Sequence, residues 1–266
     1  MIEQTGFIRS PKDIRDFTFE PPRDVAYPDT LSLFNGVPMR VKAQGGIGSC
    51  TACALASAVE YFHFKQHGAY VAFSPGFIYG CRELTGRTEP GISFRDGLHT
   101  LRHYGTVPDK CFKLTEVPDV IERFNAYQDM ASAYPNRISG YVKCETPEDI
   151  KWALMLGLPV VVAYRWRHPS STHKSGAIKW GNSEPDLHAV ICYGWDINGF
   201  KILNSWGKQW GDKGHAVIPC YELLVEAYAL TDDIYDIESV HKPKRGAVRD
   251  LGYTVVNALI GLRRER

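Results

Sequence analysis

The chain changes its pattern near residue 157, and this change constrains the fold more than any other feature. Before that point helix signals dominate: capping residues, early prolines or acids, and terminating glycines predict helices that begin near residues 50, 75, 94 and 147. Beyond it, β-branched and aromatic runs separated by turn residues predict strands over residues 159–164, 188–195, 200–204 and 215–218. The sequence therefore predicts an α+β protein with a helical lobe over about residues 39–140, an antiparallel β-sheet or barrel lobe over about residues 141–240, and a cleft between them.

Composition sets the broad class of protein. The 266 residues are 44% hydrophobic, enough to bury a sizeable core. With 31 Lys and Arg against 30 Asp and Glu, the chain has no overall charge that would draw nucleic acid or an anionic membrane to its whole surface. The longest strongly apolar run, residues 158–164, is too short to span a bilayer, and the charged N-terminus lacks a secretion-signal pattern. We expect a monomer in the cytoplasm, with no transmembrane segment and no need for nucleic acid.

The cysteine pattern favours free thiols. Seven cysteines at irregular spacing argue against a secreted disulfide framework and for a reducing compartment. Cys50-x-x-Cys53 has the spacing of a zinc half-site or redox pair, but no second pair stands at finger-like spacing, and Cys53 falls on a predicted buried helix face. Residues 45–48 resemble a phosphate loop only loosely, because they lack its Gly-Lys-Ser/Thr ending. We predict that the protein binds no metal and no cofactor.

Both ends of the chain differ from its middle. Residues 1–38 are rich in proline and charge without sustained periodicity, and we expect an extended arm that packs along the surface and partly covers the cleft as a built-in regulator. Residues 241–266 form a basic C-terminal extension with seven Lys or Arg and two acids. Its apolar stretch 251–262, followed by arginines, fits a closing helix; the alternative is contact with an acidic partner or a membrane surface.

Cys50 has the placement of a nucleophile. Ser49 is positioned to cap a helix whose apolar residues recur at three- and four-residue intervals, and Gly68 is positioned to end it. The first turn of a helix presents unpaired N–H groups and the positive end of the helix dipole, which favour a thiolate. We therefore expect the Cys50 thiol to ionise readily.

Gln44 is placed to assist that nucleophile. The glycines between residues 44 and 50 permit a tight approach to the helix and let a substrate backbone come near the sulfur. The side-chain amide of Gln44 and the backbone N–H of Cys50 would form an oxyanion hole, in which one donor contributes roughly 3 to 4 kcal/mol.

The proton-transfer partner is predicted to be His188. Seven other histidines lie in predicted helices or polar loops, whereas His188 opens an otherwise apolar strand; these are His63, His67, His99, His103, His168, His173 and His241. Asn204 follows on the next strand, where its carboxamide can accept from one ring nitrogen and fix the tautomer. Trp206 can shield that hydrogen bond from water.

These segments resemble the papain family of cysteine peptidases. The motifs Gln-Gly-x-x-Gly-Ser-Cys, His-Ala-Val and Asn-Ser-Trp-Gly occur in order at residues 44–50, 188–190 and 204–207, and the interval from Cys to His and Asn is a known signature of that family. The likeness extends over about residues 27–240 and is greatest to the bacterial branch that includes xylellain. It implies a two-lobe papain-like fold and hydrolysis of peptide bonds through a thioester. The roles implied are Cys50 as nucleophile, His188 as general acid and base, Asn204 as orienter, and Gln44 with the Cys50 amide as oxyanion donors.

The chain also departs from the family pattern. Ile47 stands where the family has a disulfide cysteine, and the usual tryptophan after the nucleophile is Thr51, which changes the wall of the cleft on the leaving-group side. Gly91 resembles the family glycine that pairs with extended substrate. Ala163 and Ala189 fall where the family lines a hydrophobic pocket.

Two alternatives use the same residues. A catalytically silent papain fold could hold a peptide without turnover, and an acyl transferase could pass the acyl group to another amine. Because all four catalytic positions carry competent residues, we favour a peptidase that acts on peptide or protein substrates.

Overall fold

The structure is a computed structural model that describes residues 5–14, 16–19, 21–22, 24–82, 89–114, 131–172, 176–219 and 221–232. The basic extension at residues 241–266, with its expected closing helix, lies outside these residues.

Helices dominate the first half of the chain, as the capping signals predict. The α-helices are α1 (Cys50–His67), α2 (Pro75–Gly80), α3 (Phe94–His103) and α6 (Pro147–Met155), and the 3-10 helices are η3 (Tyr134–Asn136) and η4 (Tyr221–Leu223). Ser74, Ser93 and Thr146 cap the last three α-helices with their side chains. No helix within the described residues has the length and apolar character needed to cross a membrane.

The α1 helix departs from its prediction at one end. Gly68 ends it in the left-handed conformation, with φ 67°, as expected. The side chain of Ser49, however, forms no capping hydrogen bond; its Oγ lies 4.0 Å from the sulfur of Cys53. Expecting a Ser49 side-chain cap was therefore wrong, because that hydroxyl turns into the buried side of the helix.

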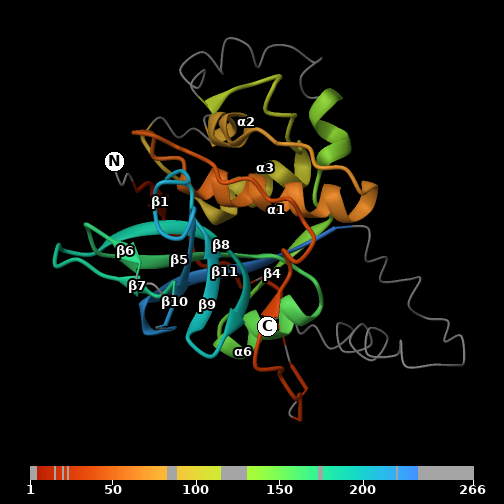
Figure 1. Ribbon diagram of the computed structural model, residues 1–266. Helices are drawn as coiled ribbons and strands as arrows, with labels where there is room; N and C mark the ends of the chain where they lie inside the picture. Colours follow the sequence, from red (N-terminus) through yellow and green to blue (C-terminus); the bar gives the residue numbers. More distant parts are fainter. Residues whose placement is uncertain are drawn as a thin grey trace, which may run out of the picture.

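An antiparallel sheet forms the second layer (Figure 1). Its strands are β4 (Gly140–Lys143), β5 (Val160–Trp166), β8 (Asp186–Asp196), β9 (Gly199–Leu203), β10 (His215–Ile218) and β11 (Leu224–Thr231). They are ordered β10-β9-β8-β5-β11-β4, and β2 (Leu31–Ser32) adds to β8. A separate short pair joins β6 (Ser171–Thr172) to β7 (Ile178–Lys179). The predicted α+β class is confirmed.

The sheet separates two apolar cores. One face packs against α1, α2 and α3, and the other packs against α6. Successive residues of the central strands alternate between the cores: Val161 and Ala163 face α1, whereas Val160 and Val162 face α6. This alternation matters for the site, because every second residue of β5, β8 and β11 is directed toward the helix that begins at Cys50.

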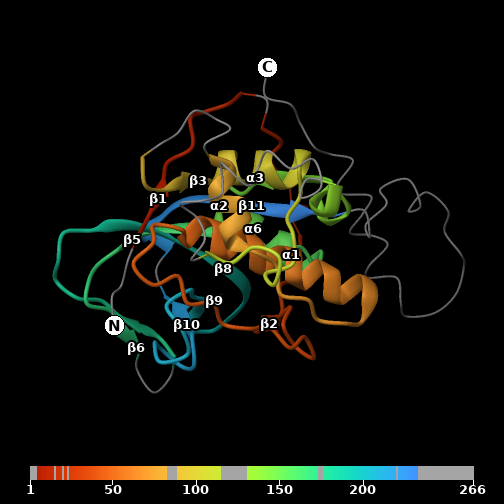
Figure 2. The same cartoon turned by 90° about the horizontal axis from the view of Figure 1, so that it is seen from above.

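The N-terminal arm runs across both layers. Its strand β1 (Phe7–Ile8) pairs in parallel with β3 (Ile92–Ser93), just before α3 (Figure 2). Further along, Thr18 forms a bridge with Lys143 at the edge of the sheet, and Phe19 is buried in the α6 core. The arm is therefore an integral part of the fold and buries side chains of its own.

A buried ion pair joins α1 to the segment that precedes it. The carboxylate of Glu60 is fully buried and pairs with the ammonium of Lys42. It also accepts from the hydroxyl of Tyr70 at 2.7 Å and from the backbone N–H of Phe73 at 3.0 Å. These donors satisfy the charge, so the pair fixes residue 42 against the helix.

We expect Glu60→Gln to lower the free energy of unfolding by about 3 to 5 kcal/mol, because it leaves the Lys42 charge buried without its counterion. Tyr70→Phe removes a single hydrogen bond to the same carboxylate and is expected to cost about 1 kcal/mol. Urea unfolding of both variants measures the difference. Equal losses would contradict the view that the charge pair dominates this network.

Candidate active site

Cys50 lies at the start of α1, at the bottom of a tight turn. Gly45 takes up a left-handed conformation, with φ 61°, and the backbone N–H of Ser49 donates to the carbonyl of Ile47 at 2.7 Å. The helix follows at once, with the N–H of Cys53 donating to the carbonyl of Ser49 at 2.9 Å. The sulfur is therefore held at a helix N-terminus, as predicted, and the residue is fully buried.

The imidazole of His188, which is on β8, packs against two aromatic rings. Trp206 stacks on the imidazole, with centroids 4.2 Å apart and an interplanar angle of 22°, and Trp166 meets it edge-on at 4.9 Å. Two rings therefore fix the plane of the imidazole. The expected shielding by Trp206 takes the form of direct stacking on the histidine.

Asn204 fixes the tautomer of His188. Nε2 of the imidazole lies 2.8 Å from Oδ1 of Asn204, which also accepts from the backbone N–H of Ser205 at 2.7 Å. Because the Ser205 contact identifies that atom as an acceptor, Nε2 must carry the proton. The lone pair of the neutral ring is then on Nδ1, which is buried and has no hydrogen-bond partner among the described residues.

The sulfur and the imidazole come from facing elements that touch. The backbone N–H of Ala189, the residue after His188, forms a hydrogen bond to the sulfur of Cys50. This contact brings the helix start and the histidine strand together across the two layers. The predicted nucleophile is thus next to the backbone of the residue that follows the predicted base.

Gln44 is fixed by the same strand end that carries Asn204. Its side-chain oxygen accepts from Oγ of Ser205 at 2.5 Å, and its side-chain nitrogen donates to the carbonyl of Ile47 at 2.9 Å. The backbone N–H of Gln44 donates to the carbonyl of Ser205 at 2.8 Å, and Ala43 bridges Trp206. The four predicted catalytic residues therefore come from three segments that are bonded to one another.

The arm lies directly over this site. The backbone of Gly6 forms a hydrogen bond to the sulfur of Cys50, and its carbonyl accepts from Ile92 N–H at 3.1 Å. A side chain at position 6 would collide with the backbone of Gly48. The hydroxyl of Thr5 donates to the carboxylate of Asp186, two residues before the histidine. Glycine is therefore required where the arm crosses the sulfur.

Burial changes the ionisation of Cys50 and His188. Exclusion of water raises the pKa of Cys50 to about 11, although N–H groups of Ala189, Thr51 and Gly6 act in the opposite direction. It also lowers the pKa of His188 to about 3, against the favourable hydrogen bond that the imidazole donates to Asn204. At neutral pH both groups are therefore uncharged. From the helix N-terminus we expected a readily ionised thiol. The structure favours the protonated thiol instead, because desolvation raises the pKa of Cys50 more than the helix N-terminus lowers it.

One of the predicted substrate-binding residues, Gly91, lies against the arm. Gly91, with φ 99°, has the carbonyl oxygen of Gly6 2.7 Å from where its Cβ would be. Ala163 and Ala189 are opposite each other on β5 and β8, fully buried, on the face toward α1. Trp206 packs on the histidine, as described above.

Other residues at the site carry weaker sequence signals. Asp186 is on the same strand as His188, two residues earlier, and therefore on the same face; Ser205 is inside the Asn-Ser-Trp-Gly motif. Glu226 is the one acid in strand β11, and Arg95 follows the α3 cap. An acid inside an otherwise apolar strand is the signal that points to Glu226.

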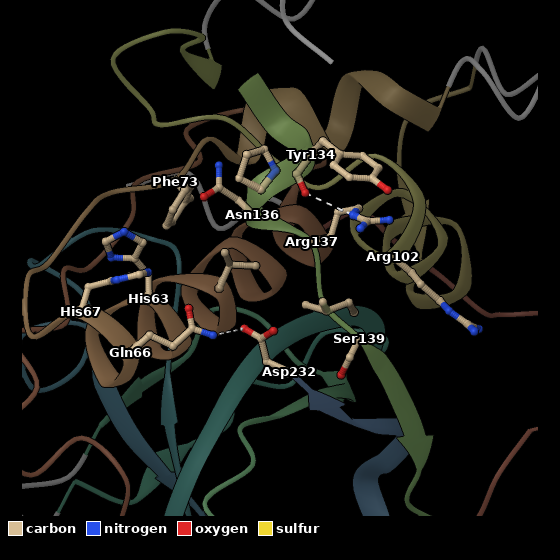
Figure 3. A pocket seen from close by; sticks show the side chains of 13 residues that line it. His63, Gln66, His67, Phe73, Arg102, Tyr134, Asn136, Arg137, Ser139 and Asp232 are labelled. Atoms are coloured by element: carbon tan, nitrogen blue, oxygen red, sulfur yellow. Dashed lines mark hydrogen bonds between the residues drawn. The ribbon is translucent and has the colours of Figure 1, made fainter. Parts of the chain in front are cut away.

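A separate cavity of about 460 Å³ lies away from these residues, between the C-terminal half of α1 and the segment around η3 (Figure 3). Its floor contains Phe73, and its rim carries His63, His67 and Arg137. Across it, Gln66 donates to Asp232 at 3.2 Å. None of the predicted catalytic residues lines it.

Within the described ranges, no group of three or more His, Cys, Asp or Glu side chains is arranged to hold a metal ion. The six cysteines that the structure describes are free thiols, which include Cys50 and Cys53. This agrees with the free thiols predicted from the sequence.

Comparisons with known proteins agree with this geometry. The family model described as papain family cysteine protease matches residues 34–221. The uncharacterised peptidase C1-like protein L477 of Acanthamoeba polyphaga mimivirus is 29% identical, covering 86% of this chain and 77% of that protein. Thiol protease aleurain of Arabidopsis thaliana is 26% identical over 72% of this chain, which spans only 56% of aleurain.

Solved structures give the same result. The crystal structure of xylellain, a cysteine protease from Xylella fastidiosa, superposes with a TM-score of 0.72 at 26% identity, covering 86% of this chain and 96% of that one. Procathepsin L 3 from Tenebrio molitor larval midgut shares the fold at 16% identity, with a TM-score of 0.62. The matched residues contain every segment that holds the predicted catalytic side chains. The chain is therefore a cysteine peptidase that belongs to the papain family.

Proposed function

We propose that the protein hydrolyses peptide bonds through a thioester on Cys50, with His188 as the general acid and base. The observation that carries the proposal is the contact of the Cys50 sulfur with the backbone beside a histidine whose Nε2 is held by Asn204. The lone pair on Nδ1 is then available for the thiol proton.

The reaction follows from these roles. Cys50 transfers its proton to Nδ1 of His188, and the sulfur attacks the carbonyl carbon of the substrate. The C–N bond breaks as His188 returns that proton to the departing amine. Water, deprotonated by His188, then attacks the thioester, and the carboxylic acid leaves as the thiol re-forms. Asn204 keeps the imidazole in the required tautomer throughout.

Two donors stabilise the oxyanion in this scheme. The backbone N–H of Cys50 belongs to the first turn of α1, where N–H groups have no partner within the helix. The side-chain amide of Gln44 supplies the second donor. Its bonds to Ser205 and Ile47 support this role, because they preorganise the amide beside the helix start.

We further propose that the arm keeps the enzyme latent in the arrangement described above. Gly6 covers the sulfur, and residues beyond it are held outside the cleft by Arg95. The guanidinium pairs with Asp16 at 2.6 Å and Asp13 at 3.6 Å, and its Nε donates to the carbonyl of Pro11 at 3.3 Å. Substrate can reach the sulfur only when this segment moves.

Cys50→Ala is expected to lower the rate of peptide hydrolysis at least about a thousandfold, because the nucleophile is lost. Cys53→Ala is the matched control: it removes the second thiol of the Cys-x-x-Cys pair and is expected to keep the activity. The rate is measured with a fluorogenic peptide library. Loss of activity in both variants to the same degree would contradict a single nucleophile and favour chemistry that needs the pair.

Arg95→Gln is expected to raise both the peptidase rate and the rate of Cys50 alkylation by iodoacetamide, by about fivefold, because loosening partly buried ion pairs by about 1 kcal/mol shifts the arm toward release. Arg102→Gln, on the same helix but away from the arm, serves as control and is expected to change neither rate. Mass spectrometry of the labelled peptide reports Cys50 separately from the exposed Cys111. Unchanged labelling in Arg95→Gln with intact folding would overturn the proposal that Arg95 holds the arm in place.

A point variant is preferable to truncation of the arm, since Phe7 and Phe19 are buried.

Acid is expected to open the arm. The pKa of His188 is about 3 in the closed arrangement, and contact with water would return it toward 6.5. Because the pKa of His188 is lower in the closed form, the imidazole takes up a proton when the arm opens below pH 6.5. The equilibrium between closed and open arm therefore shifts toward the open form as the pH falls, by up to tenfold per pH unit. His168 and Asp186 act on this imidazole, and Glu226, whose pKa burial raises, opposes the trend.

Hydrogen exchange of residues 5–8 at pH 7, 6 and 5, corrected for the intrinsic exchange rate, measures this opening. In His188→Gln the slope with pH should disappear. Protection that is independent of pH in the unsubstituted chain would contradict the link between the imidazole and the arm.

A further inference from the structure

Cys53 is a second thiol beside the predicted nucleophile, and the proposed reaction does not use it. It follows Cys50 by three residues on α1, and both are buried free thiols. Side chains three residues apart lie on the same side of a helix, with Cβ atoms about 5 to 6 Å apart. A negative charge on Cys50 raises the pKa of Cys53, so the sulfurs are near enough to affect each other's ionisation. The two thiols form a neighbouring pair.

The surroundings of Cys53 are polar, whereas a buried cysteine ordinarily serves as a small apolar side chain. Its sulfur lies 4.0 Å from the hydroxyl of Ser49 and contacts the hydroxyl of Ser205. The ammonium of Lys42, which is paired with Glu60, acts on the sulfur as a positive charge. Burial raises the pKa of Cys53 to about 12, and these groups act against that rise.

Three other buried thiols lack this arrangement. Desolvation raises the pKa of Cys81, Cys144 and Cys192 as well, but no cation among the described residues acts on these sulfurs. The carboxylate of Asp149 raises the pKa of Cys144 further. Of these four cysteines, Cys53 is therefore the one whose surroundings support a thiolate, which is the form that attacks another sulfur.

The position of the pair suits a reversible disulfide. Cys50 is the first residue of α1, so its N–H has no partner in an earlier turn of the helix. A disulfide needs Cβ atoms about 3.5 to 4.5 Å apart, so the first turn must tighten by roughly 1 to 2 Å. Redox proteins of the thioredoxin type use the same Cys-x-x-Cys spacing. We propose that Cys53 is the resolving thiol of Cys50, which closes a disulfide after a peroxide has oxidised Cys50.

The chemistry takes two steps. Hydrogen peroxide transfers an oxygen to the Cys50 sulfur, which becomes a sulfenic acid as the O–O bond breaks and water leaves. The Cys53 sulfur then attacks the sulfenic sulfur. The S–O bond breaks as the S–S bond forms, and the hydroxyl leaves as water with the proton of Cys53. Two thiols together lose two electrons, which reduce the peroxide to two waters, and a dithiol restores both thiols by exchange.

The disulfide protects the sulfur when the arm no longer covers it. A sulfenic acid that meets more peroxide becomes a sulfinic acid, which thiols do not reduce. By capturing the sulfenic acid first, Cys53 keeps Cys50 in a form that can be recovered. This inference rests on the proposed function only in naming Cys50 as the nucleophile that needs protection, and the disulfide is measured without peptidase activity.

One tryptic peptide reports the result. Cleavage after Lys42 and Lys65 releases residues 43–65, in which Cys50 and Cys53 are the only cysteines. The full chain is treated with hydrogen peroxide, the remaining thiols are alkylated with iodoacetamide, and the mass of this peptide is measured. A disulfide removes two hydrogens, whereas a sulfinic acid adds two oxygens. The peroxide dose is the one that converts half of Cys50 in the Cys53→Ala variant to sulfinic acid.

At this dose we expect the unsubstituted chain to hold the disulfide between Cys50 and Cys53, with at least about tenfold less sulfinic acid than Cys53→Ala. Dithiothreitol should return the peptide to its reduced mass. Cys192→Ala removes an equally buried thiol without a cation beside it; this control should match the unsubstituted chain. Thermal melting verifies that both variants fold, and the mass of the unsubstituted peptide alone shows whether the disulfide forms.

Three results would overturn the resolving role. They are equal sulfinic acid in the unsubstituted chain and Cys53→Ala, a Cys50 that stays reduced at every dose, and a disulfide that joins Cys50 to Cys111 of a second chain. None of these readings depends on turnover. If the untreated chain cleaves no peptide, the proposed function fails by itself, and the mass of residues 43–65 still decides the disulfide.

Discussion

The candidate site depends on a largely buried charge pair. Glu60 holds Lys42 against α1, and the carbonyl of Lys42 accepts from the backbone N–H of Gly207 at 2.9 Å. The segment from Lys42 to Gln44 is thereby fixed on two sides, by α1 and by the turn after Asn204. Two apolar residues could supply similar stability, but they could not fix a backbone segment by a directed bond at each end. The pair therefore contributes more to the position of residues 42–44 than to the free energy of unfolding.

Solvent exclusion sets the electrostatics of the site. A helix N-terminus stabilises a neighbouring anion by roughly 0.3 to 1 kcal/mol, and by up to about 2 in favourable geometry. The pKa of Cys50 is raised from 9.0 to about 11, which corresponds to about 3 kcal/mol against the thiolate. Burial therefore outweighs the helix while the arm is in place. In the proposed mechanism this pocket suits a thiolate and an imidazolium once water or substrate replaces the arm, because the N–H donors of Ala189 and Thr51 remain.

Local signals were enough to single out the predicted nucleophile and base. Cys50 follows a glycine-rich turn and begins a helix with a clear stop at Gly68, and His188 lies near the start of an apolar strand, so neighbouring residues alone pointed to both. The α+β class followed in the same way from the change of pattern along the chain. What local patterns could not give was the consequence of long-range contacts: the ionisation of Cys50 depends on Gly6, which lies 44 residues away in the sequence.

Strand β11 illustrates a second limit. Its central residues are buried on both faces, so it lacks the alternation of polar and apolar residues that indicates a strand, and alanines weaken its β-propensity. Without the strand, no register places Glu226 opposite Ala163. The expected side-chain cap by Ser49 was wrong for a related reason. The packing of the turn, and not the position of Ser49 before the helix, determines what its hydroxyl contacts.

The position of the arm over the Cys50 sulfur also affects how readily oxidants can reach it. Peroxides attack thiolates that they can reach, and the closed chain presents at Cys50 a protonated thiol with no exposed surface. Cys81, Cys144 and Cys192 are buried in the same way, whereas Cys111 is exposed. Oxidants therefore meet Cys111 first among the cysteines described, and the nucleophile is stored in its reduced form. In the proposed mechanism, the arm movement that admits a peptide also ends this protection, so catalytic competence and vulnerability to sulfenic acid formation begin together.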